Sequence, residues 1–124
     1  MKILVVDDEK DVEVLFEQRF RKEIRNHEMV FVFAFSGEEA ITYLNLHEHE
    51  AVLILSDINM PGMSGLELLK HIKQKHLKPP PVVMMINAYG DAENYNIAKE
   101  RGADDFLSKP VDFTALKEKL KITN

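Results

Sequence analysis

Lys2-Ile3-Leu4-Val5-Val6-Asp7-Asp8, close to the N-terminus, is the stretch that indicates the fold most directly. After Lys2 the run is continuously apolar instead of alternating between apolar and polar residues. That pattern is typical of a parallel strand covered on both faces. Two carboxylates follow at once, and the stretch Ala51–Ser56 is followed by Asp57 in the same way. The repeated pattern favours a parallel sheet whose strands end in acidic residues.

Apolar runs alternate with helical patterns along the whole chain. We predict strands at Lys2–Val6, Met29–Phe35, Ala51–Ser56, Val82–Ile86 and Asp105–Ser108. Helices between and after them are predicted from capping signals, which are capping boxes at Ser36–Glu39 and Ser64–Glu67 and single caps at Asp91 and Asp112. This alternation predicts an α/β protein with a doubly wound (βα)5 parallel sheet.

The first helix is predicted as one amphipathic segment. Its apolar side chains recur at helical spacing and mark a single buried stripe, formed by Val12, Leu15, Phe16, Phe20 and Ile24. The last helix is predicted from Phe113 to about Ile122. We expect residues 1–124 to form one domain, which either stands alone or was cut from a longer protein ahead of an output domain.

Composition and charge exclude several functional classes. The chain has 124 residues, no cysteine and a net charge of −5. Without cysteine there is no disulfide framework and no thiolate metal site, and the negative balance argues against direct binding to nucleic acid. The apolar N-terminal run is too short for a signal peptide, and no other stretch approaches a membrane span. We therefore expect a cytoplasmic location.

Polar side chains gather where the predicted strands end. They are Asp7, Asp8, Asp57, Asn87 and Lys109. In a parallel α/β sheet, ligands bind outside the carboxyl ends of the strands, so we expect these groups to meet. Neighbouring carboxylates repel one another, and a hard divalent cation such as Mg²⁺ resolves that conflict. A carboxylate between a metal ion and an ammonium group can act as a nucleophile toward phosphorus.

Four segments carry a resemblance to a known family. They are Val5–Glu9, Ser56–Gly65, Asn87–Asp91 and Gly102–Pro110. With them the chain resembles, over essentially all 124 residues, the receiver domain of bacterial two-component response regulators of the chemotaxis response regulator type. The resemblance implies a flavodoxin-like sheet with the strand order 2-1-3-4-5. It also implies a signalling switch that catalyses its own phosphorylation and dephosphorylation, and not a metabolic enzyme.

The resemblance implies a role for each residue at the acidic end of the sheet. Asp57 resembles, by its position in the motif, the phosphoacceptor of the family, and it would also contact Mg²⁺. Asp8 resembles the residue that binds Mg²⁺ directly, and Asp7 resembles the one that binds the ion directly or through water. Asn59 would offer its backbone carbonyl to the metal and modulate the reaction rate, and Lys109 would pair with the phosphoryl group.

Further roles are implied around the neighbouring loops. The peptide bond that precedes Pro110 is expected to be cis, and Asn87 and Ala88 would contact the phosphoryl group. The family usually has Thr or Ser in place of Asn87, whose NH₂ group can still donate, and often has Tyr in place of Phe106. These two residues would form the switch. Tyr89 is expected to shield the acyl phosphate and slow its hydrolysis.

The same resemblance implies the partners. A sensor histidine kinase or a histidine phosphotransfer protein would donate the phosphoryl group. An output domain, a partner protein or a second copy would bind the face made by the fourth helix, the fifth strand and the fifth helix. Tyr95, Phe106 and Leu116 are the residues we expect on that face.

Three other functions are compatible with an α/β fold of this kind and are weighed against the sequence. A phosphatase of the haloacid dehalogenase type would end its first strand in Asp-x-Asp, whereas this chain has Asp7-Asp8 without a spacer. A flavodoxin-like cofactor site would need a Ser/Thr/Gly-rich phosphate loop after the first strand, whereas the acidic Asp7-Asp8-Glu9 found there would repel a flavin phosphate. The third alternative is a receiver fold that docks partners with weakened phosphorylation-dependent switching or none, which Asn87 keeps open.

Overall fold

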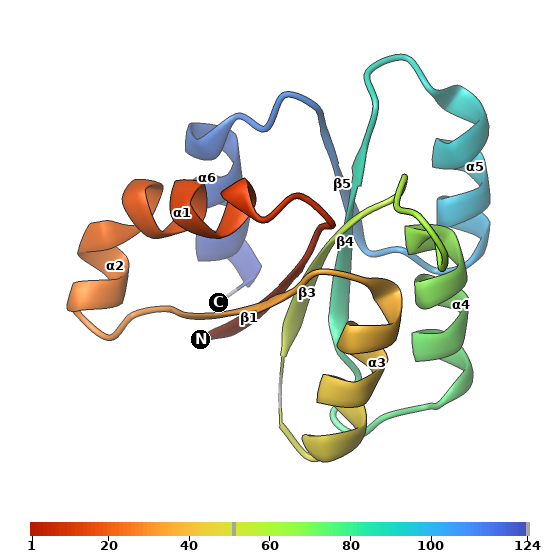
Figure 1. The fold of residues 1–124 in the computed structure, drawn as a ribbon, viewed down its shortest axis with the longest axis horizontal. Coiled ribbons are helices and arrows are strands. Elements are labelled where there is room, and N and C mark those ends of the chain that lie inside the picture. The colour runs from red at the N-terminus through yellow and green to blue at the C-terminus, as the bar shows by residue number, and fades with distance from the viewer. Residues whose placement is uncertain (51, 124) are drawn as a thin grey trace.

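A parallel sheet of five strands forms the centre of the molecule, in the order β2-β1-β3-β4-β5 (Figure 1). The computed structural model describes residues 1–50 and 52–123. The strands are β1 (Lys2–Val6), β2 (Val30–Ala34), β3 (Leu53–Asp57), β4 (Val82–Asn87) and β5 (Asp105–Ser108). The predicted strands and their order are confirmed with small shifts at their ends. Ala51, where the third strand was predicted to begin, lies outside the described residues.

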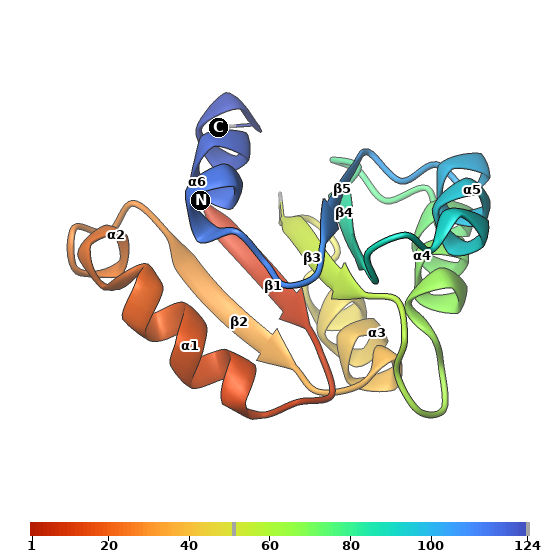
Figure 2. The ribbon, with the colours of Figure 1, turned by 90° about the horizontal axis from the view of Figure 1, so that it is seen from above.

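Helices cover both faces of this sheet (Figures 1 and 2). One face carries α1 (Asp11–Arg19), α2 (Arg21–Arg25) and α6 (Phe113–Thr123), and the other carries α3 (Gly37–Leu46), α4 (Gly65–Gln74) and α5 (Ala92–Glu100). This is the predicted doubly wound α/β architecture. Within residues 1–50 and 52–123, no helix has the length and apolar character needed to cross a membrane.

The two helical layers explain why the strands are continuously apolar. In β1, the side chains of Ile3 and Val5 join the core under α1 and α6, whereas Leu4 and Val6 join the core under α3, α4 and α5. Every residue of β3 is buried as well. A strand with no solvated face has no position at which a polar side chain is favoured, except at its end.

The predicted caps are present, except that the box predicted at Ser36–Glu39 is a single cap formed by Ser36. Ser64 and Glu67 form a complete capping box at the start of α4, and Ser36 accepts a hydrogen bond from the backbone of Glu39 at the start of α3. Asp91 caps α5 in the same way. At the start of α6, Asp112 accepts from two backbone N–H groups. These side chains satisfy donors that the first turn of a helix leaves free.

The predicted single first helix is wrong, because the segment breaks at Phe20. This residue joins α1 to α2 with a non-helical backbone (φ −110°, ψ 22°). Its ring is fully buried, stacks on Phe16 and lies 4.9 Å from the ring of Phe31. Packing into this aromatic cluster outweighs continuation of the helix. Leu15, expected in the buried stripe, is 39% exposed.

Gly65 fixes the distance between α4 and the end of β3. A Cβ atom at this position would lie 2.1 Å from the backbone oxygen of Asp57 and 2.8 Å from Cα of Ile58. The N–H group of Gly65 also donates to the carbonyl of Ile58 at 2.8 Å. The start of α4 therefore rests directly on the backbone that carries the Asp57 side chain.

Gly65→Ala is expected to lower the free energy of unfolding by about 3 kcal/mol, because neither backbone segment can move aside easily. Gly37→Ala is the matched control. Gly37 is also the first residue of a helix, but its added Cβ would meet the flexible Met63 side chain. Urea unfolding of both variants measures the difference. Equal losses would contradict the explanation by backbone contact.

Candidate functional site

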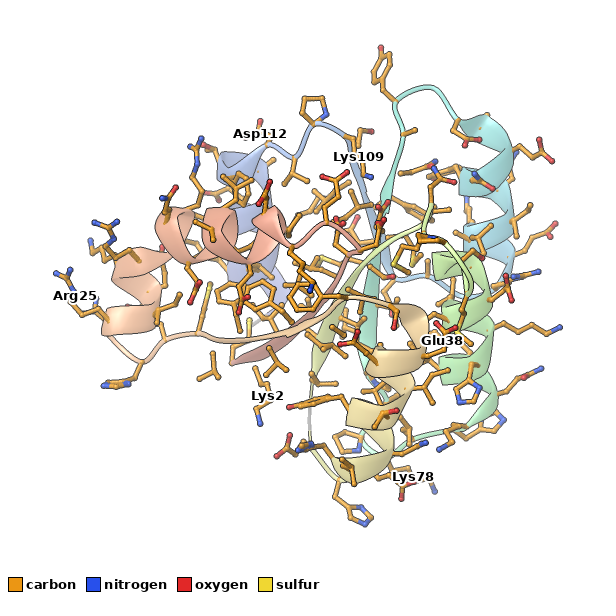
Figure 3. The ribbon with its side chains drawn as sticks, in the orientation of Figure 1. Lys2, Arg25, Glu38, Lys78, Lys109 and Asp112 are labelled. Carbon is orange, nitrogen blue, oxygen red and sulfur yellow. The ribbon has the colours of Figure 1, made fainter. Side chains whose placement is uncertain are left out.

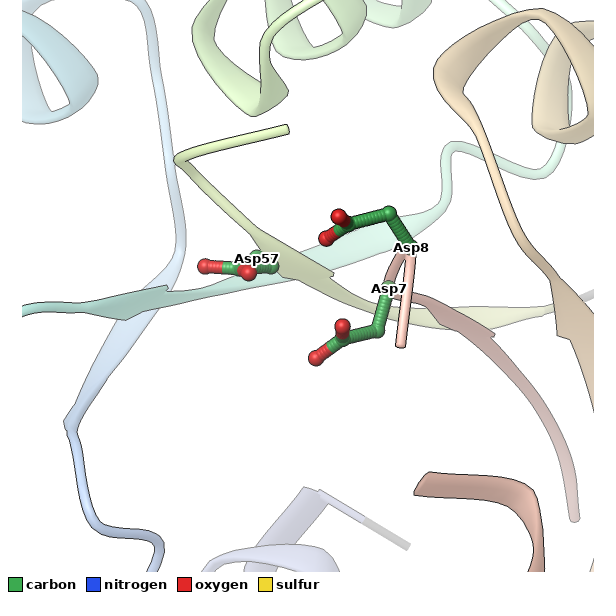
Figure 4. A group of neighbouring side chains, drawn as sticks. All are labelled: Asp7, Asp8 and Asp57. Carbon is green, nitrogen blue, oxygen red and sulfur yellow. The ribbon is translucent and has the colours of Figure 1, made fainter. Parts of the chain in front are cut away.

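Three carboxylates converge at the carboxyl ends of β1 and β3 (Figure 4). Asp57 is the last residue of β3, and Asp7 and Asp8 follow β1 directly. Because Val6 pairs with Ser56 in the sheet, the next residues of the two strands lie side by side. One ligand oxygen from each carboxylate lies within 4.8 Å of the others. The predicted acidic cluster is thus formed.

Asp57 is the most buried carboxylate of the cluster, with 2% of the residue exposed. Its Oδ2 atom accepts a hydrogen bond from the Lys109 ammonium at 2.8 Å. Its Oδ1 atom is buried and has no hydrogen-bond partner among the described residues. A buried carboxylate with an unsatisfied oxygen is costly unless further positive charge is near.

Lys109 reaches Asp57 from the segment after β5. Figure 3 shows it on the opposite side of the molecule from Lys2, the first residue of β1, and from Lys78, which comes before β4. The Lys109–Pro110 peptide bond is cis. Burial lowers the pKa of Lys109, but the hydrogen bond and charge of Asp57 outweigh it, so the pKa is raised. The ammonium therefore stays charged beside the carboxylate.

The pKa of Asp7 is raised, chiefly because its carboxyl group is partly buried. Burial raises the pKa of its carboxyl group, and the charges of Asp57 and Asp8 act in the same direction. A hydrogen bond from the Glu9 backbone and the charge of Lys109 oppose this rise. The net effect is a carboxyl that ionises less readily than usual.

These observations fit a magnesium ion. Three carboxylates supply hard oxygen ligands, and Oδ1 of Asp57 is buried without a hydrogen-bond partner among the residues that the structure describes. The neighbouring carboxylates also add to the rise in the pKa of Asp7 that its burial causes. Asn59, predicted to offer its carbonyl, is an exposed residue two positions after Asp57. The metal and the roles of the individual ligands stay predictions.

Asn87 lies at this edge, but its amide group is already bonded elsewhere. It ends β4 and is 6% exposed. Its Nδ2 atom donates to the backbone oxygen of Asp91 at 2.8 Å, while its Oδ1 atom has no partner among the described residues. Ala88 next to it is half-buried, and Tyr89 is 88% exposed. The bond from Asn87 to Asp91 was not predicted from the sequence, although the predicted cap at Asp91 indicated that a helix begins four residues after the end of this strand.

Of the three residues predicted for the output face, Tyr95 and Phe106 lie at the surface and Leu116 does not; the face itself stays a prediction. The rings of Tyr95 and Phe106 pack with centroids 4.3 Å apart, and both side chains are partly exposed. Leu116 is fully buried, because the side of α6 that carries it packs on the sheet among Phe16 and Phe20. Leu116 is therefore a core residue and contributes nothing to a docking surface.

A cavity of about 590 Å³ opens beside the acidic cluster, and the sequence did not predict it. It lies between α1 and the segment after β5, and Asp7 and Lys109 are part of its wall. The remaining wall is mainly apolar and includes Leu15, which explains the exposure of that residue. The apolar surface of α1 is thus shared between the core and this opening.

Comparisons with known proteins agree with this geometry. Residues 3–121 match the family model of the response regulator receiver domain. The chain belongs to this family. Over 120 residues it is 38% identical to the response regulator protein PilR of Pseudomonas aeruginosa, covering 94% of this chain and 24% of that protein. It is 36% identical over its full length to a cyclic di-GMP phosphodiesterase of Thermotoga maritima, of which it covers 30%.

Solved structures show the same fold. The receiver domain of Francisella response regulator 1452 matches with a TM-score of 0.81 and 27% identity, covering 98% of this chain and 93% of that one. The receiver domain is therefore the unit that this chain shares with two-component response regulators. The chain spans less than half the length of the curated relatives it matches, since coverage of those named above is 24% and 30%.

Asp7→Asn is expected to stabilise the metal-free receiver domain by about 1 kcal/mol at neutral pH, because it removes one of three close charges. Folding raises the pKa of Asp7. This carboxyl group therefore stabilises the folded state fully below its ordinary pKa of 3.8, and that stabilisation is lost as the pH rises through the pKa that the group has in the folded protein. The variant should lack that pH-dependent loss. Urea unfolding in chelator at several pH values measures both effects.

Glu17→Gln, which removes an exposed carboxylate in α1, is the control and should change little. An Asp7→Asn protein that is no more stable than wild type in chelator would show that the three carboxylates do not repel significantly.

Proposed function

We propose that this receiver domain accepts a phosphoryl group on Asp57 and thereby changes the face formed by α5, β5 and α6. The observation that carries the proposal is the state of the Asp57 carboxylate. It is buried, and Lys109 holds one of its oxygens. The other oxygen has no hydrogen-bond partner within the described part of the chain, and the carboxylates of Asp7 and Asp8 lie close to Asp57. The Lys109 bond would hold the nucleophilic carboxylate in one orientation, and the Lys109 ammonium would offset negative charge on the transferred phosphoryl group.

The reaction follows from these contacts. A carboxylate oxygen of Asp57 attacks phosphorus of a phosphohistidine, the O–P bond forms, and the N–P bond breaks with its electron pair on the leaving nitrogen. The Lys109 ammonium lies within hydrogen-bond distance of Asp57 and would stabilise the charge on the transferred group. Mg²⁺ held by Asp7, Asp8, Asp57 and the Asn59 carbonyl would supply further positive charge.

Residues of the neighbouring loops would contact the phosphorylated Asp57 and set how fast its acyl phosphate is hydrolysed. Asn87 and Ala88 at the end of β4 would contact the phosphoryl group, and Asn87 and Phe106 would form the switch. The exposed positions of Asn59 and Tyr89 suit residues that control how water approaches the acyl phosphate. Hydrolysis by that water would return Asp57 to the carboxylate.

The partners we propose are those of a two-component system. A histidine kinase or a histidine phosphotransfer protein in the cytoplasm would be the donor. An output domain, a separate protein or a second copy would bind the face that carries Tyr95 and Phe106. A docking module without phosphorylation-dependent switching is the second candidate, and the existing bond of Asn87 to Asp91 is the observation that favours it.

Incubation with acetyl phosphate and Mg²⁺ is expected to add one phosphoryl group to the wild type and none to Asp57→Asn, as measured by intact mass. Chelation of Mg²⁺ should slow the reaction at least about a hundredfold, because several kcal/mol of charge stabilisation are lost. Glu17→Gln, which removes an exposed carboxylate in α1, is the control. Equal labelling of Asp57→Asn and wild type would refute Asp57 as the acceptor. No labelling of the wild type, from acetyl phosphate or from a kinase, would favour the docking module.

Tyr89→Ala is expected to speed loss of the phosphoryl group about threefold to tenfold, if the ring limits access of water. Tyr89→Phe should behave like the wild type, since the shielding is steric. Both rates can be measured by following the phosphorylated protein after removal of donor. A rate that does not change in Tyr89→Ala would show that the ring lies away from the path of water.

A further inference from the structure

The short helix α2 carries an exposed basic surface. Phe20 separates it from α1 with a non-helical backbone, and the Phe20 ring is fully buried in the aromatic cluster. Of the five residues that follow, Arg21, Lys22 and Arg25 are exposed, and together they form the basic corner of the molecule. Figure 3 shows Arg25 pointing away from the rest of the protein.

The remaining residues of α2 hold this helix in one position. Ile24 packs against the core under α1 and α6. The Glu23 carboxylate lies 3.3 Å from the Lys117 ammonium of α6 and is 17% exposed. The backbone oxygen of Glu23 also accepts from the N–H groups of Glu28 and Met29, at 2.9 and 3.4 Å. Glu23 is the acidic residue of α2, and its charge is directed inward to α6, so the outer surface of the helix stays basic.

The basic corner has no ion-pair partner within the described ranges 1–50 and 52–123, whereas lysines of several other elements pair with carboxylates. The exposed Glu17 and Glu28 flank it in the sequence, and neither forms an ion pair with it there. Arg21 and Arg25 are four residues apart in the helix, where like charges repel each other. A bound anion relieves that repulsion.

The charge of the whole chain decides which kind of anion fits. The net charge is −5, although the basic corner contributes three positive charges. A membrane or a nucleic-acid duplex is wider than α2, and its charge would also be brought against the acidic remainder of the surface. A short acidic segment can contact the corner alone, because charges further away than about 8 Å are largely screened at physiological ionic strength.

The basic corner also lies away from the acidic cluster. Helix α1 begins shortly after Asp8 and runs back along the sheet, so α2 lies near the other ends of the strands, where β2 starts at Val30 (Figures 1 and 2). A segment bound to α2 therefore leaves Asp57 uncovered.

We propose that the basic corner docks an acidic segment of a partner protein, whose carboxylates accept from Arg21, Lys22 and Arg25. The inference goes beyond the proposed function and does not depend on phosphorylation of Asp57. A guanidinium group can bind a carboxylate through two parallel hydrogen bonds. Since α2 is already fixed on the core, little backbone freedom is lost on binding.

Binding of the peptide octaglutamate at low ionic strength tests the inference. In the isotope-labelled protein, the backbone amide signals of residues 20–26 should shift more than those of other exposed segments. Replacement of the whole corner, by Arg21→Gln with Lys22→Gln and Arg25→Gln, should weaken binding about tenfold, because three charge contacts are lost. Lys22→Gln alone should weaken it about twofold to threefold and provides the comparison should the triple variant unfold.

A second triple variant is the matched control. Lys70→Gln, Lys78→Gln and Lys99→Gln together remove the same charge from exposed positions outside α2. This protein should bind octaglutamate about as well as the wild type, if the corner and not the overall charge attracts the peptide.

Three results would overturn the proposal. The first is an equal loss of affinity in the control and in the corner variants. The second is the absence of shifts in residues 20–26 when octaglutamate is added to the wild type. The third is tighter binding of wild type to phosphatidylglycerol vesicles or to duplex DNA than to octaglutamate, which would assign the corner to a broad polyanion.

Discussion

The buried charge of Asp57 is the constraint on which the rest of the site depends. A carboxylate that is 2% exposed must be compensated from within the protein or by a bound cation. Lys109 compensates one oxygen, while Asp7 and Asp8 add negative charge next to the other. Three carboxylates thus face one ammonium group, and burial together with the charges of Asp57 and Asp8 raises the pKa of Asp7.

The fold holds this charge in place through backbone contacts. Asp57 ends a strand that is buried on both faces, and α4 begins on its carbonyl because Gly65 has no side chain. Lys109 is held through the bond of its N–H group to Asn87 on β4. Each side chain of the site thus comes from the end of a strand whose position the two cores determine. A shift in any of these strands would change the Lys109–Asp57 distance directly.

Properties that depend on local pattern could be predicted from the sequence. Continuous apolar runs identify strands with two covered faces, and acids at their ends identify the cluster of Asp7, Asp8 and Asp57. Properties that depend on which side of a helix meets the sheet could not. Leu116 is apolar in a surface helix, and only the packing of α6 decides that it is buried. The break at Phe20 has the same cause, because the distant Phe31 stabilises it.

The two helices beside the site differ in how firmly they are attached, and the difference suits their positions. Helix α4 supports Asp57 and is fixed by several buried side chains and a complete capping box. Helix α5 buries Ala98 and is tied to β4 through the carboxamide of Asn87. A rigid support keeps the Asp57 carboxylate aligned with Lys109, whereas an element with few buried side chains opens at lower cost. The bond from Asn87 to the Asp91 carbonyl is therefore one of the contacts that hold the first turn of α5 to the sheet.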